Sequence, residues 1–383
     1  MPRVRKVIAE MPHQRIGAVS KLGVGDPDVI PLWFGESDLP TPDFVSEAAI
    51  RALKAGQTRY VNKRGVPELR QAIRDYTAAQ WGVDIDLDRI TVTGSGMTAI
   101  MIATECVVDQ GDNVVMISPI WPNIFYCTWT MGGECRHVRL IDGERGWRLD
   151  LDELFDACDE RTRAIFIASP SNPTGWTMPV EQKRAVLEFC RARGIWIISD
   201  EVYHRIVYDR PVADSFLQLA EPDDPLFVVH SFSKSWAMTG WRLGWLVHPA
   251  GLGDKMGDLS GINNTGATTF VQHAGVAAIR EGEAFVAEMR DYCRRGRDFI
   301  YQRLAGMERI HLTPPEAAFY AFLKVEGLQD DLGFAQNLVK TARVGLAPGT
   351  AFGPDNEGYL RLCFASSEAK LSEALDRLEA ALG

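Results

Sequence analysis

The chain has 383 residues, 46% of them hydrophobic, and 41 Lys and Arg against 51 Asp and Glu give a formal net charge of −10. This length allows one large domain with a satellite, or two domains. The acidic balance argues against nucleic acid or an anionic membrane surface as a partner.

The sequence shows no sign of a membrane protein, a secreted protein or a zinc protein. No stretch approaches the length of a membrane span, and no apolar signal-peptide core follows the basic N-terminal residues. The seven cysteines are scattered and form neither a Cys-x-x-Cys pair nor a zinc spacing with histidine. We therefore expect a cytoplasmic protein with free thiols and no metal site.

After an irregular crossing over 31–42, the chain alternates helices and strands. Expected helices cover Phe44–Ala55, Glu68–Gln80, Met97–Val108 and the segment from Pro179 to Arg193. Expected strands cover Ile90–Thr93, Asn113–Ile117, Arg163–Ala168, Ile195–Ser199, Leu226–Val229 and Leu243–Val247. This alternation predicts an α/β fold, a mainly parallel sheet with helices on both faces.

Beyond about residue 285 the regular alternation of strands and helices ends. A charged helix is expected over Phe285–Leu304 and another near Gly333–Thr341, followed by a strand over Tyr359–Ala365 that carries Arg361. The last helix has Leu371, Leu375, Leu378 and Leu382 at helical spacing. We predict a large domain over 45–285 and a smaller α+β domain formed by 1–44 and 286–383.

Polar clusters follow the apolar strands directly, and they include Gly94–Met97, Trp121, Asn172, Asp200 and Lys234. Ligands of such sheets bind at the carboxyl ends of the strands. The sequence therefore predicts that these residues converge on one crevice.

One of these clusters, in the stretch His230–Trp245, indicates the ligand. Ser231, Ser233 and Arg242 suit a phosphate, and the amine of Lys234 suits an aldehyde. Pyridoxal 5'-phosphate carries both groups. Taken alone, the stretch is also compatible with a surface turn that carries scattered charges.

The chemistry of this cofactor calls for further partners. Asp200 would keep the pyridine nitrogen protonated, although alone it could equally cap a helix. Asn172 and Tyr203 would bond the phenolate oxygen, where the alternatives are a turn residue and a core aromatic. Trp121, otherwise an ordinary core residue, would stack on the ring. The phosphate would also meet the backbone of Ser95, Gly96 and Met97 at a helix start.

At this point the sequence resembles a known family. The run Ser-Phe-Ser-Lys-x-x-x-Met-x-Gly-x-Arg-Leu-Gly over 231–244 is similar to the lysine signature of class I/II aminotransferases of fold type I, the aspartate aminotransferase-like group. The runs 169–175, 199–203 and 359–364 also match in order and spacing. The resemblance implies a seven-stranded sheet in the large domain and covers the chain from about Leu32 onward.

The resemblance also implies roles. Lys234 would bind the cofactor as a Schiff base and move the substrate proton, with Asp200 and Tyr203 assisting catalysis. Arg361 would bind the α-carboxylate, a bidentate task that suits arginine, and Gly35, Trp121 and Asn172 would lie beside the substrate. Tyr60 would reach the phosphate of a neighbouring subunit, so a homodimer with shared sites is implied, with 263–269 also at the interface.

The implied reaction moves an amino group from an L-amino acid to a 2-oxo acid by a ping-pong mechanism. The loop 261–270 lacks the arginine that animal-type aspartate aminotransferases place there. Ile16, Gly17, Phe34 and Trp121 favour neutral or aromatic side chains, and acidic substrates stay open.

Two other functions remain compatible with the sequence. A C–S β-lyase of the cystathionine or cysteine-conjugate type would use the same fold. A non-catalytic regulator that binds the cofactor is less favoured, because the candidate lysine is present and no basic winged-helix segment precedes Leu32.

Overall fold

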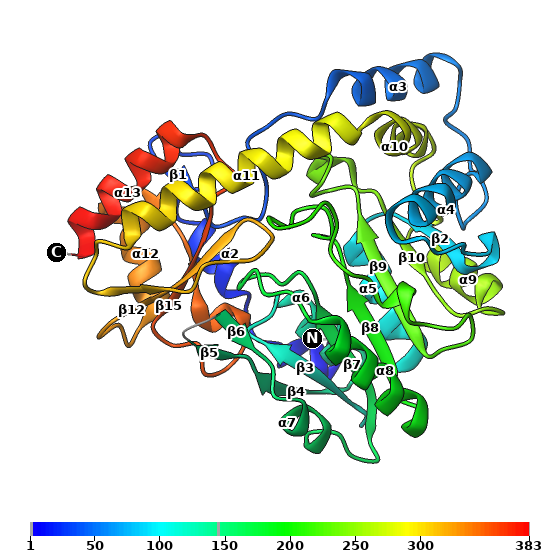
Figure 1. Cartoon of the computed structure of the whole chain (residues 1–383), viewed down its shortest axis with the longest axis horizontal. Coiled ribbons are helices and arrows are strands. Elements are labelled where there is room, and N and C mark those ends of the chain that lie inside the picture. The colour runs from blue at the N-terminus through cyan, green and yellow to red at the C-terminus, as the bar shows by residue number, and fades with distance from the viewer. Residues whose placement is uncertain (1–2, 144–145, 383) are drawn as a thin grey trace.

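The computed structural model describes residues 3–143 and 146–382, and a seven-stranded sheet forms its centre (Figure 1). The strand order is β2-β10-β9-β8-β7-β3-β4. Its strands are β2 (Ile90–Thr93), β3 (Asn113–Ser118), β4 (Glu134–Arg139), β7 (Thr162–Ala168), β8 (Trp196–Asp200), β9 (Leu226–Ser231) and β10 (Gly244–Val247). Only β10 runs antiparallel to its neighbours in this sheet. The expected mainly parallel α/β sheet is confirmed.

The sheet has an apolar core on each face. Alternate residues of β7 enter different clusters, with Ala164 and Phe166 in one and Ile165 and Ile167 in the other. Side chains alternate between the faces of a strand, so a strand buried on both faces reads as a continuous apolar run. This is why the strands were recognisable in the sequence.

Helices cover both faces of this sheet. They are α3 (Asp43–Lys54), α4 (Pro67–Trp81), α5 (Gly96–Val107), α6 (Asn123–Met131), α7 (Leu151–Asp156), α8 (Val180–Arg193), α9 (Gly253–Asn264) and α10 (Thr269–Glu281). The sequence did not indicate α6, α7, α9 or α10. Helix α6 is rich in aromatic and β-branched residues and α9 contains three glycines, and these residue types are weak helix formers.

The C-terminal part forms a second, four-stranded sheet in the order β11-β12-β15-β14. Its elements are α11 (Glu283–Leu304), β11 (Ile310–Leu312), β12 (Tyr320–Val325), α12 (Asp331–Thr341), β13 (Val344–Gly345), β14 (Ala347–Pro348), β15 (Tyr359–Cys363) and α13 (Glu368–Leu382). The long helix α11 runs from α10 beside the large sheet to α13 (Figure 1).

The N-terminal segment joins this C-terminal part. It contains α1 (Lys6–Ala9), α2 (Arg15–Ser20) and β1 (Ile30–Pro31), and β1 pairs in parallel with β13. A small ladder, β5 (Ile141–Gly143) with β6 (Gly146–Arg148), completes the regular structure. Within 3–143 and 146–382, no helix is both long and apolar enough to cross a membrane.

Candidate active site

A cavity of about 310 Å³ lies at the carboxyl ends of β8 and β9. The start of α5, strand β15 and the N-terminal segment close it from the other sides. Most of the residues singled out from the sequence line it, namely Gly35, Gly96, Met97, Trp121, Asn172, Asp200, Tyr203, Ser231, Ser233, Lys234, Arg242 and Arg361. The structure therefore gathers residues that lie more than 300 positions apart in the chain.

Lys234 follows β9 and presents its amine at the cavity. Its Nζ donates a hydrogen bond to the carbonyl oxygen of Gly35 at 2.5 Å. It also lies 5.7 Å from the ring centroid of Tyr203 and 5.9 Å from that of Phe319. Burial lowers the pKa of this amine to about 8, because low-polarity surroundings disfavour the charged form. The lowered pKa increases the fraction of neutral amine at physiological pH, and the neutral amine is a nucleophile and a base.

Asp200 is the last residue of β8, and its carboxyl group is buried at the cavity floor. Its Oδ1 accepts a hydrogen bond from the Val202 amide at 3.2 Å. Burial raises the pKa of this carboxyl to about 7, and the charge of Lys234 only partly opposes the shift. A cationic group placed beside it would restore the carboxylate.

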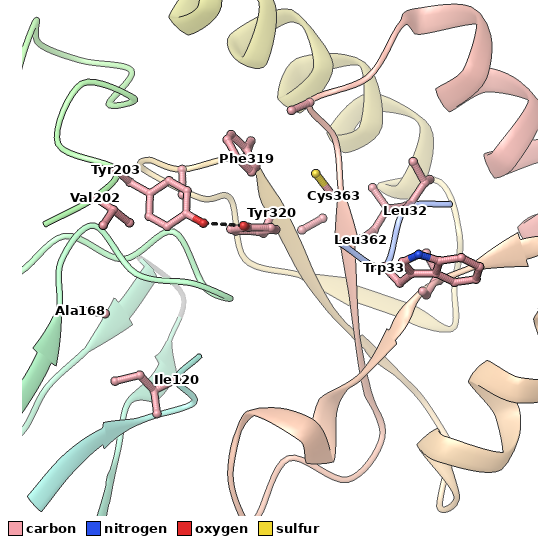
Figure 2. Packing of buried hydrophobic residues seen from close by; sticks show 14 of the residues in the cluster. Leu32, Trp33, Ile120, Ala168, Val202, Tyr203, Phe319, Tyr320, Leu362 and Cys363 are labelled. Carbon is pink, nitrogen blue, oxygen red and sulfur yellow. Dashed lines mark hydrogen bonds between the residues drawn. The ribbon is translucent and has the colours of Figure 1, made fainter. Parts of the chain in front are cut away.

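Two tyrosines meet beside Lys234. The hydroxyl of Tyr203 lies 2.5 Å from that of Tyr320 on β12, and the dashed line in Figure 2 marks this hydrogen bond between the two elements. Burial raises the pKa of Tyr203 well above its usual value. Burial raises the pKa of Tyr320 as well, so both hydroxyls stay protonated at neutral pH. One proton lies in the shared hydrogen bond, and the other can be donated to an oxygen anion in the cavity.

Arg361 on β15 is almost fully buried at the opposite wall. Its Nη1 donates to Oδ1 of Asn172 at 3.1 Å, and its Nη2 donates to the carbonyl oxygen of Trp33. Its Nε has no acceptor within the described part of the chain. Its hydrogen-bond partners among the described residues are an amide and a carbonyl and not a carboxylate, so it can receive a carboxylate from a ligand.

The start of α5 forms an anion site. Ser95 caps the helix, since its hydroxyl accepts from the Thr98 amide at 2.9 Å. Gly96 and Met97 line the cavity. Their backbone amides lie in the first turn of α5, where no carbonyl of the helix can accept from them. A Cβ on Gly244 would lie 2.5 Å from the Gly96 nitrogen, so glycine lets β10 pass this close.

Three side chains complete the anion site. The hydroxyls of Ser231 and Ser233 are 2.8 Å apart, and Nη1 of Arg242 donates to the carbonyl oxygen of Thr239 at 2.6 Å. Two hydroxyls, a guanidinium and a helix N-terminus together suit a phosphate.

Two predicted residues lie outside the cavity. The Ser95 side chain is used as the helix cap, and Tyr60 is 90% exposed on another hollow beside 264–270. Conversely, Tyr320, Trp33 and Asn123 line the cavity and were not singled out. Each belongs to an apolar or proline-rich run without a distinctive pattern, so no sequence signal marked it.

A buried amine with a lowered pKa, a buried carboxyl and the N-terminus of a helix meet in one cavity, and together they suit an aldehyde cofactor that carries a phosphate. The family model described as "Aminotransferase class I and II" matches residues 27–378. The chain belongs to this family. It is a class I aminotransferase with pyridoxal 5'-phosphate as its cofactor, and the expected fold type I is confirmed.

Similar proteins cover nearly the whole chain. An aspartate aminotransferase of Pyrococcus horikoshii is 35% identical over 359 residues, 93% of this chain and 91% of the relative. Aromatic-amino-acid aminotransferase 2 of Thermococcus litoralis is 33% identical over 366 residues, 94% and 93% of the two chains. A single mutant of Thermus thermophilus aspartate aminotransferase superposes with a TM-score of 0.92 at 30% identity, with 100% of both chains covered.

The residues present fit the cofactor. Asp200 is a buried acid whose pKa burial raises to about 7, and a protonated pyridine nitrogen is the kind of partner that lowers it again. The amides at the start of α5 can donate hydrogen bonds to an acceptor such as a phosphate oxygen. Lys234 would supply the amine for the aldehyde.

Proposed function

We propose that this aminotransferase transfers the amino group of an L-amino acid with a neutral or aromatic side chain to a 2-oxo acid, with Lys234 as the residue that binds the cofactor and moves the substrate proton. The observation that carries this proposal is the meeting of the Lys234 amine, the buried Asp200 carboxyl and the guanidinium of Arg361 in one cavity.

Lys234 acts twice in this proposal. Its amine would hold the aldehyde group of the cofactor, and once free it would remove the proton from the substrate Cα. Bound pyridoxal phosphate supplies an electron sink for the charge left on Cα. The lowered pKa of about 8 supports this role, because a catalytic base works best with a pKa near the operating pH.

Asp200, Asn172 and Tyr203 would orient and polarise the cofactor ring. Asp200 would pair with the pyridine nitrogen as a carboxylate, while the side chains of Asn172 and Tyr203 would donate to the phenolate oxygen. Trp121, which lines the same cavity, would stack on the ring face.

The phosphate would occupy the start of α5. There the amides of Gly96 and Met97, with the hydroxyls of Ser231 and Ser233 and the guanidinium of Arg242, would neutralise its charge. Ser95 would contribute through its cap, which orders this helix start.

Arg361 would bind the substrate α-carboxylate. Its hydrogen bonds to Asn172 and the Trp33 carbonyl hold the planar guanidinium in place, and a fixed fork loses little entropy on binding a carboxylate. Gly35 would lie beside this carboxylate. A larger residue at this position would collide with Tyr320.

The substrate side chain would meet Ile16, Phe34 and Trp121, which line the cavity next to Arg361. These apolar and aromatic side chains support a neutral or aromatic substrate. The names of the relatives point to aspartate in one case and to aromatic amino acids in the other, so both classes belong in the test.

We also propose a homodimer and a division into two domains, 45–285 and the combination of 1–44 with 286–383. The side chains of Tyr60 and Ile262 are 90% and 80% exposed in the single chain. Large apolar side chains exposed to this degree support a surface that a second subunit covers. In the dimer Tyr60 and the segment 263–269 would reach the phosphate of the other subunit.

The half-reaction with single amino acids tests the proposed function. Purified holoenzyme is mixed with L-phenylalanine, L-alanine or L-aspartate, and the change in cofactor absorbance is followed as pyridoxamine phosphate forms. Stoichiometric conversion without an added oxo acid supports transamination. Release of pyruvate and ammonia from cystathionine, with no conversion by any amino acid, would instead establish a β-lyase.

A further inference from the structure

A second hollow lies directly beside the catalytic cavity. It measures about 520 Å³, and Ile16, Phe34, Trp121 and Asn123 line both spaces. The hollow is bounded by α2, by α6 and by the turn around 350–354. The two spaces therefore adjoin each other, on the side of the catalytic cavity that the N-terminal segment covers.

The walls of the hollow are aromatic. Seven aromatic rings line it, those of His13, Phe34, Trp121, Phe125, Tyr126, Trp129 and His137. Several of them already pack edge to face, with Phe125 5.1 Å from His137 and Tyr126 5.3 Å from Trp129 between ring centroids. Among the described residues, the lining holds no Asp or Glu, and it includes the charged side chain of Arg15 beside polar Gln14 and Thr350. The rings can stack on the ring of an aromatic substrate, and an arginine guanidinium can lie on the face of such a ring as well.

The sizes of the two spaces point the same way. The catalytic cavity, at about 310 Å³, lies at the lower end of the range for ligand pockets, roughly 300–1,000 Å³. It has to hold both the cofactor and the part of the substrate common to all amino acids. A bulky side chain therefore needs further room, and the hollow supplies it.

We propose that the hollow is the subsite for the side chain of the amino donor, and that the donor is an aromatic amino acid whose ring passes Phe34 and Trp121 into it. This inference rests on the proposed function and specifies its substrate class. Phe34 is 42% exposed, so at the boundary between the two spaces its ring has an open face for such a contact.

Gly17 in α2 gives a way to fill the hollow. It belongs to the lining, and a Cβ built on it would meet only Cβ of Gln14, at 3.8 Å. Gly17→Leu therefore adds bulk to the hollow without a backbone clash, and leucine favours a helix more than glycine does. Gly306→Leu is the matched control, because a Cβ at Gly306 meets only the carbonyl oxygen of Arg303, at 4.0 Å, and Gly306 does not line either space.

The test compares kcat/KM of the half-reaction for L-tryptophan and L-alanine in the holoenzymes. Gly17→Leu is expected to lower kcat/KM for tryptophan by about 10- to 100-fold, a usual effect of a misfitting apolar pocket, and to change it less than about twofold for alanine. Gly306→Leu is expected to leave both unchanged. Trp129→Ala, which removes a wall instead of filling the space, should also weaken tryptophan selectively.

The outcomes separate this inference from the proposed function. Equal losses for both amino acids, or no loss for either in both hollow variants, would overturn the aromatic subsite while transamination stands. A wild-type enzyme that converts aspartate and not tryptophan would overturn it too. Failure of every amino acid to convert the cofactor would contradict the proposed function itself.

Discussion

The Nζ of Lys234 lies 2.5 Å from the carbonyl oxygen of Gly35, which joins the end of the central sheet to the N-terminal segment. A Cβ at position 35 would overlap the hydroxyl of Tyr320, so only glycine lets the backbone come this close to the amine. Two residues earlier, the carbonyl oxygen of Trp33 accepts from Arg361. One short stretch of backbone therefore positions both the amine and the guanidinium of the site.

Replacement of Arg361 by lysine tests the carboxylate site. We expect Arg361→Lys to lower kcat/KM by about 10- to 100-fold, mainly through KM, because an ammonium cannot make the bidentate contact. Steady-state kinetics with one amino acid measures this. Arg303→Lys, at a surface ion pair with Asp376, is the control and should leave the kinetics unchanged. A pure loss of kcat with unaltered KM would contradict this role.

Asp200 predicts a pH dependence of the cofactor-free protein. Its pKa is about 7 when folded against an ordinary 3.8, so between these values the folded state binds more protons than the unfolded state. The free energy of unfolding then falls as pH rises through this window, by at most about 1.4 kcal/mol per pH unit.

The amide variant Asp200→Asn cannot titrate and should lack this fall. Urea unfolding of the two cofactor-free proteins is expected to give similar midpoints near pH 4 and a higher midpoint for the variant at pH 8. Parallel profiles over the whole range would rule out a buried, protonated Asp200. With cofactor present, the same variant should bind it more weakly, because the pyridine nitrogen loses its carboxylate.

Two buried ionisable side chains, Lys183 and Glu201, lie near each other without a direct salt bridge among the described residues. Lys183 is 1% exposed, its Nζ has no hydrogen-bond partner in the described residues, and it lies 4.6 Å from the ring centroid of Phe216. Burial lowers the pKa of this lysine, and the nearby carboxylate of Glu201 opposes the shift. Oε1 of Glu201 accepts from the Phe216 amide at 3.0 Å.

Either single variant, Lys183→Met or Glu201→Gln, should destabilise the protein by about 3 kcal/mol, since removal of one partner strands a buried charge. The double variant should lose less free energy of unfolding than the sum of the losses of the two single variants. Chemical denaturation of the four proteins gives the coupling. Additive losses would mean that the two side chains do not interact.

Much of the large sheet and of the cofactor site could be predicted from the sequence. The strands are continuous apolar runs because both of their faces are buried, and the polar residues after them meet at one edge because parallel strands share a direction. Asp200 and Lys234 could be placed in one crevice on that argument alone.

Other features depend on contacts between distant segments. Tyr320 lies in an apolar run and reaches the cavity only because β12 pairs with β15, where Phe322 faces Arg361. Lys183 reads as a surface lysine of a polar helix, and its burial follows from Glu201 and Phe216, which approach only in the fold. The aromatic hollow likewise joins α2, α6 and residues 350–354, which no local pattern connects.

The attachment site of the cofactor tests the central claim most directly. The holoenzyme is reduced with sodium borohydride, digested, and analysed by peptide mass spectrometry. We predict that the cofactor is bonded to Lys234 alone and that Lys234→Ala carries none and has no measurable half-reaction. Attachment to a different lysine, such as the buried Lys183, or an active Lys234→Ala variant would contradict the account.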